Sequence, residues 1–76
     1  MGIELQIYNS WLGGERIDGA KFLHNSSVEV GSGEYAGEVG SIVSLVQLGE
    51  NARYVVETNS GQDIEVAENE IAHRAS

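Results

Sequence analysis

The sequence predicts an all-β domain built from five short strands. The chain of 76 residues contains ten glycines and no proline, and short apolar runs lie between turn residues. This pattern is typical of a chain of β-hairpins. No stretch sustains the 3.6-residue apolar period of a helix. Because a chain of this length buries only about 60% of the surface that its unfolded form exposes, we expect one compact domain.

The N-terminal residues are expected to form an additional β segment. The segment concerned is Ile3–Leu12. In its first residues apolar and polar side chains alternate, which is the period of a half-buried strand. Ile3, Ile7 and Trp11 also recur every four residues, which would allow a turn of amphipathic helix. We favour the strand. Asp18-Gly19 then predicts a two-residue hairpin turn before a strand over 20–23, and the polar residues 24–27 predict a second turn.

The rest of the chain shows clearer strand patterns. Valines flank Glu29, and later runs alternate apolar and polar side chains between glycine- and asparagine-containing turns. The long run after Val39 is apolar on both faces in places, which indicates a bend or a bulge. The predicted elements are strands over Val28–Val30, Val39–Leu48, Arg53–Thr58 and Asp63–Val66, a helical turn over Ala67–Glu70, and a return to the core at Ile71.

Four glycines, Gly31, Gly33, Gly37 and Gly40, lie within ten residues. A dinucleotide-binding loop would need a different glycine spacing and a helix after it. A β-branched, strand-like run follows Gly40 instead, and no Gly-Lys pair of a phosphate-binding loop occurs. The glycines are therefore interpreted as corners of a small β-structure, where they permit bulges and positive φ angles.

The spacing of glycines and apolar residues carries a resemblance over about residues 27–73. The residues concerned are Val28, Val30, Gly33, Gly37, Gly40, Ile42, Val43, Tyr54, Val56, Glu57, Gly61, Glu70 and Ile71. In this spacing the chain resembles the small five-stranded barrels of the Src-homology-three and KOW type. The resemblance implies a small five-stranded Src homology 3-like barrel over 27–76, preceded by an N-terminal strand and hairpin extension over 1–26, in one compact domain.

One enzyme family shares this shape and length. Ser32–Gly37 and Tyr54–Glu57 are similar to segments of the plasmid-encoded type II dihydrofolate reductases, which form small barrels around a shared pore. The family's chemistry rests on a Val-Gln-Ile-Tyr stretch in the next strand, where this chain has Asp63–Ala67. Glu29 and Val30 stand where the family's basic pore residues would be expected. The resemblance therefore implies the shape, and the departures argue against the activity.

The charge balance restricts the class of partner. Twelve acidic residues face four bases, which gives a formal net charge of −8. Binding to nucleic acid relies on lysine and arginine to neutralise phosphates, so we expect no nucleic-acid partner. An acidic surface keeps a protein soluble and attracts basic proteins. We therefore expect a basic protein partner, together with a homodimer that would bury more core.

The remaining indicators concern compartment and chemistry. The chain has no cysteine, so it contains no disulfide. The first residues show neither a basic region nor a long apolar run, and the apolar run Ile42–Leu48 is interrupted by polar residues. We expect a cytoplasmic protein without a membrane segment. Two histidines give a small catalytic inventory, and we expect no cofactor, no metal and no catalytic residues.

The candidate site is an aromatic groove that binds a partner. Barrels of this type often hold a peptide between the first loop and the loop before the third strand. Tyr35 and Glu34 lie in that first loop, and Trp11 is expected to approach it. The alternative is that Trp11 packs the N-terminal segment over one end of the barrel.

Two functional hypotheses follow from these observations. The first is a non-enzymatic interaction module or accessory subunit. The second is an oligomeric small-molecule binder or enzyme whose site forms between subunits, as in the reductases it resembles in shape.

Overall fold

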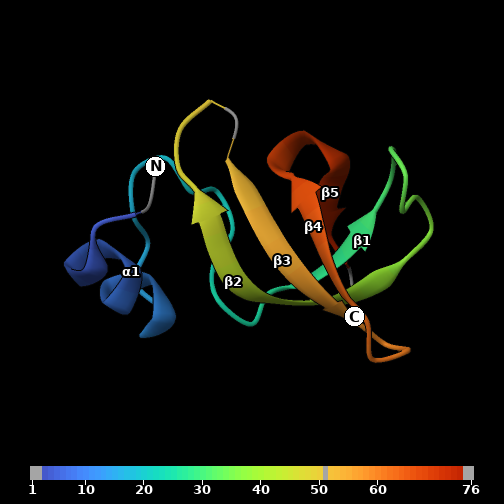
Figure 1. Cartoon of the computed structure of the whole chain (residues 1–76), viewed down its shortest axis with the longest axis horizontal. Helices are drawn as coiled ribbons and strands as arrows, with labels where there is room; N and C mark the ends of the chain where they lie inside the picture. Colours follow the sequence, from blue (N-terminus) through green and yellow to red (C-terminus); the bar gives the residue numbers. More distant parts are fainter. Residues whose placement is uncertain (1–2, 51, 75–76) are drawn as a thin grey trace.

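A short helix precedes a five-stranded antiparallel sheet in the computed structural model, which describes residues 3–50 and 52–74 (Figure 1). No helix within these residues has the length and hydropathy to span a membrane. The elements are α1 (Leu5–Leu12), β1 (Ser27–Val30), β2 (Val39–Gln47), β3 (Arg53–Thr58), β4 (Asp63–Ala67), the 3₁₀ helix η1 (Glu68–Glu70) and β5 (Ile71–His73).

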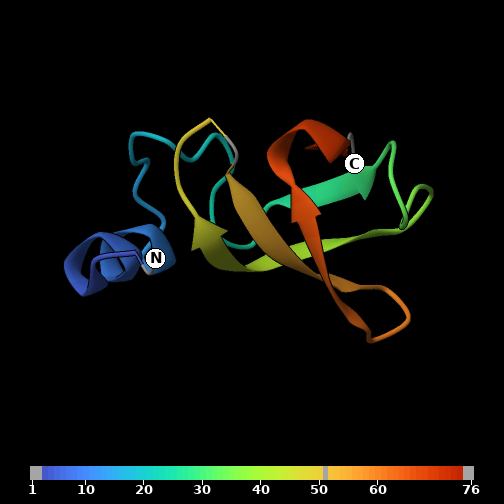
Figure 2. The same ribbon diagram turned by 45° about the horizontal axis from the view of Figure 1, so that its top comes forward.

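The strands follow the order β4-β3-β2-β1-β5. β2 is long enough to pair with β1 near its start and with β3 along its length. Two register shifts interrupt the β2–β3 pairing, between Ile42 and Ser44 and between Leu45 and Gln47. The predicted irregularity in this strand is confirmed, and it bends the sheet around the core (Figure 2).

The alternation predicted for the strands that form β1, β3 and β4 is confirmed. Val28 and Val30 are buried in β1 while Glu29 is exposed. In β3 and β4 every second side chain is likewise buried, including Tyr54 and Val56. The helical turn expected before the last strand is η1, and the side chain of Ile71 returns to the core at 8% exposure.

The sheet is not closed into a barrel by strand pairing among the described residues. Its two edges are β4 and β5, and η1 lies between them in the chain. At the end of β4 the Ala67 N–H donates to Oε1 of Glu70, at 2.9 Å, rather than to a neighbouring strand. The expected barrel is therefore replaced by an open, strongly bent sheet.

The predicted N-terminal strand is wrong, because residues 5–12 form α1. A strand would place Leu5 on the same face as Trp11, yet Leu5 is 71% exposed and Trp11 is fully buried. In the helix Tyr8 and Trp11 are three residues apart and share one side, with ring centroids 5.9 Å apart. Both side chains then face the sheet, and this packing outweighs the strand-like alternation.

The segment after α1 contains the predicted turn but no strand over 20–23. A single bridge joins Ile17 to Ala20 across Asp18-Gly19, and Gly19 has a φ of 86°. The carbonyl of Gly19 accepts a hydrogen bond from the Gly49 N–H at 2.9 Å. A side chain at Gly19 would approach this nitrogen to 3.0 Å, so glycine is required by both the turn and the close contact.

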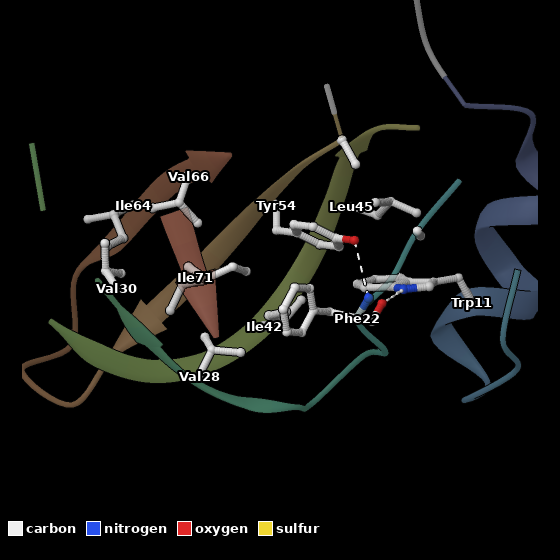
Figure 3. Packing of buried hydrophobic residues seen from close by; sticks show 13 residues of the cluster. Trp11, Phe22, Val28, Val30, Ile42, Leu45, Tyr54, Ile64, Val66 and Ile71 are labelled. Carbon is white, nitrogen blue, oxygen red and sulfur yellow. Dashed lines mark hydrogen bonds between the residues drawn. The ribbon is translucent and has the colours of Figure 1, made fainter. Parts of the chain in front are cut away.

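The core fills the concave side of the sheet, and the N-terminal segment completes one end of it (Figure 3). Trp11 and Phe22 lie beside Tyr54 and Leu45 at that end. The ring of Phe22 meets Tyr54 edge-on, with centroids 5.7 Å apart. The sheet supplies the remaining large core side chains: Val28, Val30, Ile42, Val56, Ile64, Val66 and Ile71.

Candidate functional site

Trp11 is a core residue and does not line a groove with Tyr35. Its side chain is fully buried, and its Nε1 donates to the Phe22 carbonyl at 2.9 Å. Its ring also packs near His24, with centroids 5.3 Å apart. α1 and the β1–β2 loop lie at opposite ends of the molecule in both views (Figures 1 and 2). The expected groove is corrected accordingly: Trp11 packs the N-terminal segment against the sheet.

Tyr35 and Glu34 lie together in the β1–β2 loop. Glu34 is exposed, and Tyr35 is half-buried against the edge of the core. The loop is held by Gly37 N–H, which donates to the Val30 carbonyl at 2.8 Å, and by Gly31 N–H, which donates to the Glu70 carbonyl at 2.7 Å. Glu34 and Tyr35 therefore remain a predicted contact site for a partner, and Trp11 is not part of it.

A polar network joins the N-terminal segment to the sheet through Glu68. The Tyr54 hydroxyl donates to Oε2 of Glu68 at 2.6 Å, and the Lys21 N–H donates to the same oxygen at 2.9 Å. The Tyr54 hydroxyl also accepts from the Phe22 N–H at 3.3 Å. Burial, together with the hydrogen bond to Glu68, raises the pKa of Tyr54 far above its usual value. The network thus fixes the Glu68 carboxylate at the surface.

Two recesses lie beside this carboxylate. One has a volume of about 320 Å³ and is lined by Arg16, Asp18 and Lys21, among others. The second, of about 170 Å³, includes Glu50 and Arg53 in its lining. Glu68 lines both. Three of the four bases of the chain therefore gather here against three acids, so this part of the surface is close to neutral.

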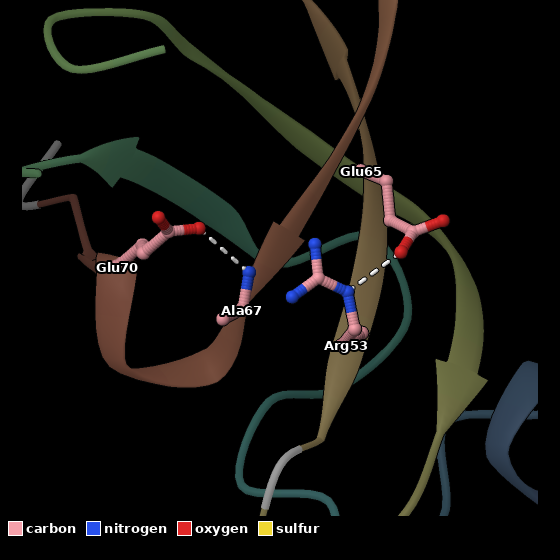
Figure 4. A network of polar contacts seen from close by, with 4 residues as sticks. All are labelled: Arg53, Glu65, Ala67 and Glu70. Atoms are coloured by element: carbon pink, nitrogen blue, oxygen red, sulfur yellow. Dashed lines mark hydrogen bonds and ion pairs between the residues drawn. The ribbon is translucent and has the colours of Figure 1, made fainter. Parts of the chain in front are cut away.

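The outer face of the β3–β4 hairpin carries unbalanced negative charge. Glu57 and Asp63 are cross-strand partners and both are exposed. Glu65, also exposed, accepts from Nε of Arg53 at 2.6 Å (Figure 4). Like charges directly opposite one another on a sheet are destabilising. Among the described residues no cation forms an ion pair with Glu57 or Asp63, so their charge faces solvent.

The acidic C-terminal end does not form a metal centre within residues 3–50 and 52–74. Glu70 turns back to the Ala67 N–H, and a side chain at Gly33 would overlap its carboxylate. His73 packs on Phe22, with ring centroids 4.7 Å apart. Glu70 belongs to η1 and His73 to β5, and their side chains make different contacts.

The sequence indicated only part of this arrangement. Tyr54 alternates inward in a predicted strand, and a buried tyrosine hydroxyl usually finds a partner. That signal predicts a polar contact without naming Glu68. The gathering of Arg16 and Lys21 beside Arg53 has no sequence signal, because the first two precede the sheet and the third begins β3. No family model, no curated protein and no solved structure matches this chain.

Proposed function

We propose that the chain is a protein-interaction module of Src homology 3-like arrangement that binds a basic segment of a partner. The arrangement is supported by β1, which pairs with both β2 and β5, by the bulged β2, and by η1 before the last strand. The likeness of this open, bent sheet to the Src homology 3 arrangement and the role as an interaction module are proposals that rest on these features.

The observation that carries this function is the Glu57–Asp63 pair on the outer face of the β3–β4 hairpin. The two carboxylates face each other across the strands without a cation between them. Such a pair reduces the free energy of unfolding. Lysine or arginine side chains of a partner would relieve this repulsion, and the net charge of −8 would attract them from a distance.

The test is the double variant Glu57→Gln/Asp63→Asn, titrated with a fluorescein-labelled oligolysine peptide at low and at physiological salt. Each exposed ion pair contributes about 0.2–1 kcal/mol, so loss of two such contacts should lower the affinity about two- to thirtyfold. The same variant should be the more stable protein, because the cross-strand repulsion is removed.

The matched control is Glu34→Gln/Glu38→Gln, which removes the same charge from the β1–β2 loop. We expect it to retain more of the affinity than the hairpin variant. A larger loss in the control would assign binding to the loop of Tyr35 instead. Equal, small losses in both variants would contradict a localised site and reduce the interaction to net charge.

Self-association is a separate prediction for this module. A homodimer would bury more apolar surface than a chain of 76 residues buries alone. Sedimentation equilibrium checks it directly, and a mass of 8.2 kDa at working concentration would contradict it.

A further inference from the structure

The surface beside α1 combines apolar and acidic residues outside the β3–β4 hairpin. A shallow groove of about 300 Å³ runs between α1 and the segment that follows it. Its lining consists of Glu4, Gln6, Ile7, Ser10, Glu15 and Ile17. We call these six residues the α1 groove. The groove is open to solvent, so an aliphatic side chain of a partner can approach it directly.

The apolar side chains of the α1 groove are partly exposed to solvent. Ile7 is 37% exposed although its helix neighbour Trp11 is fully buried. Ile17 is half-buried and leads into the Asp18-Gly19 turn. Exposed isoleucine beside a groove contributes binding energy when a partner covers it, because apolar surface then leaves water.

The charged part of the α1 groove determines which partner fits. Glu4 and Glu15 are both exposed, and the groove lining includes no base. Residues 5–12 of α1 carry no charge at all. Arg16, although next to Glu15 in sequence, lines the recess beside Glu68 instead. A second copy of this chain joined symmetrically at the groove would bring its own Glu4 and Glu15 against these carboxylates.

We propose that the α1 groove binds an amphipathic basic segment of a partner protein, with an aliphatic side chain against Ile7 and Ile17 and flanking lysine or arginine beside Glu4 and Glu15. This inference rests on the proposed function, because it takes the partner to be basic. It adds a second binding surface, at which an apolar side chain of the partner is held. Glu4 and Glu15 are complementary in charge to a basic segment, and they would repel the same residues of a second copy of this chain.

The experiment uses an 18-residue helical peptide of leucine and lysine with one apolar face. A peptide with serine in place of leucine tests charge alone, and a leucine–glutamine peptide tests apolar contact alone. We expect the leucine–lysine peptide to bind most tightly, with amide chemical-shift changes centred on Ile7, Ser10 and Ile17. Ile7→Ser and Glu4→Gln/Glu15→Gln should each weaken its binding about tenfold, since a buried isoleucine or two charge contacts have that weight.

The matched control is Asn9→Ala, an exposed position of α1 outside the groove, which should change affinity less than about twofold. Circular dichroism of each variant establishes that the fold is retained. Leu5→Ser is a second control, because it removes exposed apolar surface from α1 away from the groove. Binding that persists in Ile7→Ser, or shift changes confined to β3 and β4, would overturn the α1 groove while leaving the hairpin proposal intact. A lower sedimentation mass of Ile7→Ser without peptide binding would assign the groove to a second copy and overturn the proposal.

Discussion

Gly40 occupies a position in β2 where the backbone of β3 leaves no space for a side chain. A Cβ atom there would overlap the Glu57 carbonyl and lie 2.8 Å from Cα of Thr58. Gly31, in contrast, has its nearest neighbour at 3.9 Å, the Glu70 carbonyl. Neither glycine has a positive φ, so the two positions differ in available space rather than in backbone strain.

Gly40→Ala is expected to lower the free energy of unfolding by about 1–3 kcal/mol, the usual cost of forcing atoms into a packed site. Gly31→Ala is the control and should change it by less than about 0.5 kcal/mol. Urea unfolding of both variants measures the difference. Equal effects would contradict the close approach of β2 and β3 at this position.

Tyr54 is the residue through which the sheet and the N-terminal segment share a polar network. Its hydroxyl donates to Glu68 and accepts from the buried Phe22 N–H. Without it, the buried Phe22 N–H loses its hydrogen-bond partner, whereas Glu68 keeps the Lys21 N–H and lies partly exposed. The cost of an unsatisfied buried group is about 1–3 kcal/mol.

Tyr54→Phe should therefore reduce the free energy of unfolding at neutral pH, and the deficit should shrink at high pH. The pKa of Tyr54 is raised in the folded protein, chiefly by burial. In the wild type, the stability contributed by the neutral Tyr54 hydroxyl is present in full below the pKa of about 10 that tyrosine has in the unfolded chain. It is lost as the pH rises from there towards the higher pKa of the folded protein. Above pH 10 the gap to Tyr54→Phe should close by about 1.4 kcal/mol per pH unit. Denaturant unfolding from pH 8 to 11 checks this, and a constant gap would contradict it.

α1 is attached to the sheet by side chains from one side of the helix. Tyr8 reaches β2, where its hydroxyl lies 2.8 Å from Oγ of Ser44, and Trp11 is enclosed by the core. Leu5 and Leu12 remain exposed on the helix. An isolated helix of this length is unstable in water, so α1 depends on these contacts.

A double-mutant cycle of Tyr8→Phe and Ser44→Ala is expected to give a coupling free energy of about 0.5–1.5 kcal/mol, the net contribution of one hydrogen bond. Each single variant should also move the fluorescence of Trp11 towards that of an exposed indole. Val46→Ala, an exposed position on the same strand, serves as the control for Ser44. Additive effects of the two substitutions would contradict the docking of α1 on β2.

The whole molecule carries its charge unevenly. Arg16, Lys21 and Arg53 line the two recesses beside Glu68, and most of the acids lie elsewhere on a body that extends 32 Å along its longest axis. At 10 mM salt the screening length is about 30 Å, and at 150 mM it is about 8 Å. At low salt, repulsion therefore acts across nearly the entire molecule.

Raising sodium chloride from 10 to 150 mM is expected to increase the melting temperature by about 4 °C or more, which corresponds to about 1 kcal/mol for a domain of this size. The Glu57→Gln/Asp63→Asn variant should gain less, because part of its repulsion has been removed. Differential scanning calorimetry measures both proteins. A melting temperature independent of salt would contradict a stability limited by net charge.

The strands of residues 28–73 follow from the chain itself. Alternation in β1, β3 and β4 requires only that neighbouring side chains point to opposite faces, which is a local property of extended backbone. The turn at Asp18-Gly19 and the 3₁₀ turn at η1 are likewise local. The bulge in β2 was foreseen because its apolar residues exceed what one buried face can hold.

The helical state of residues 5–12 depends instead on contacts distant in sequence. Tyr8 of the helix meets Ser44, 36 residues away, and no local pattern encodes such a pair. The segment after the helix is attached in the same way, since the Lys21 N–H meets Glu68, 47 residues away. The same holds for the burial of Trp11 and for the gathering of three bases around one carboxylate. Periodicity fixes which side chains can point inward; only the folded chain selects which distant surfaces meet, because packing and charge pairing act between elements.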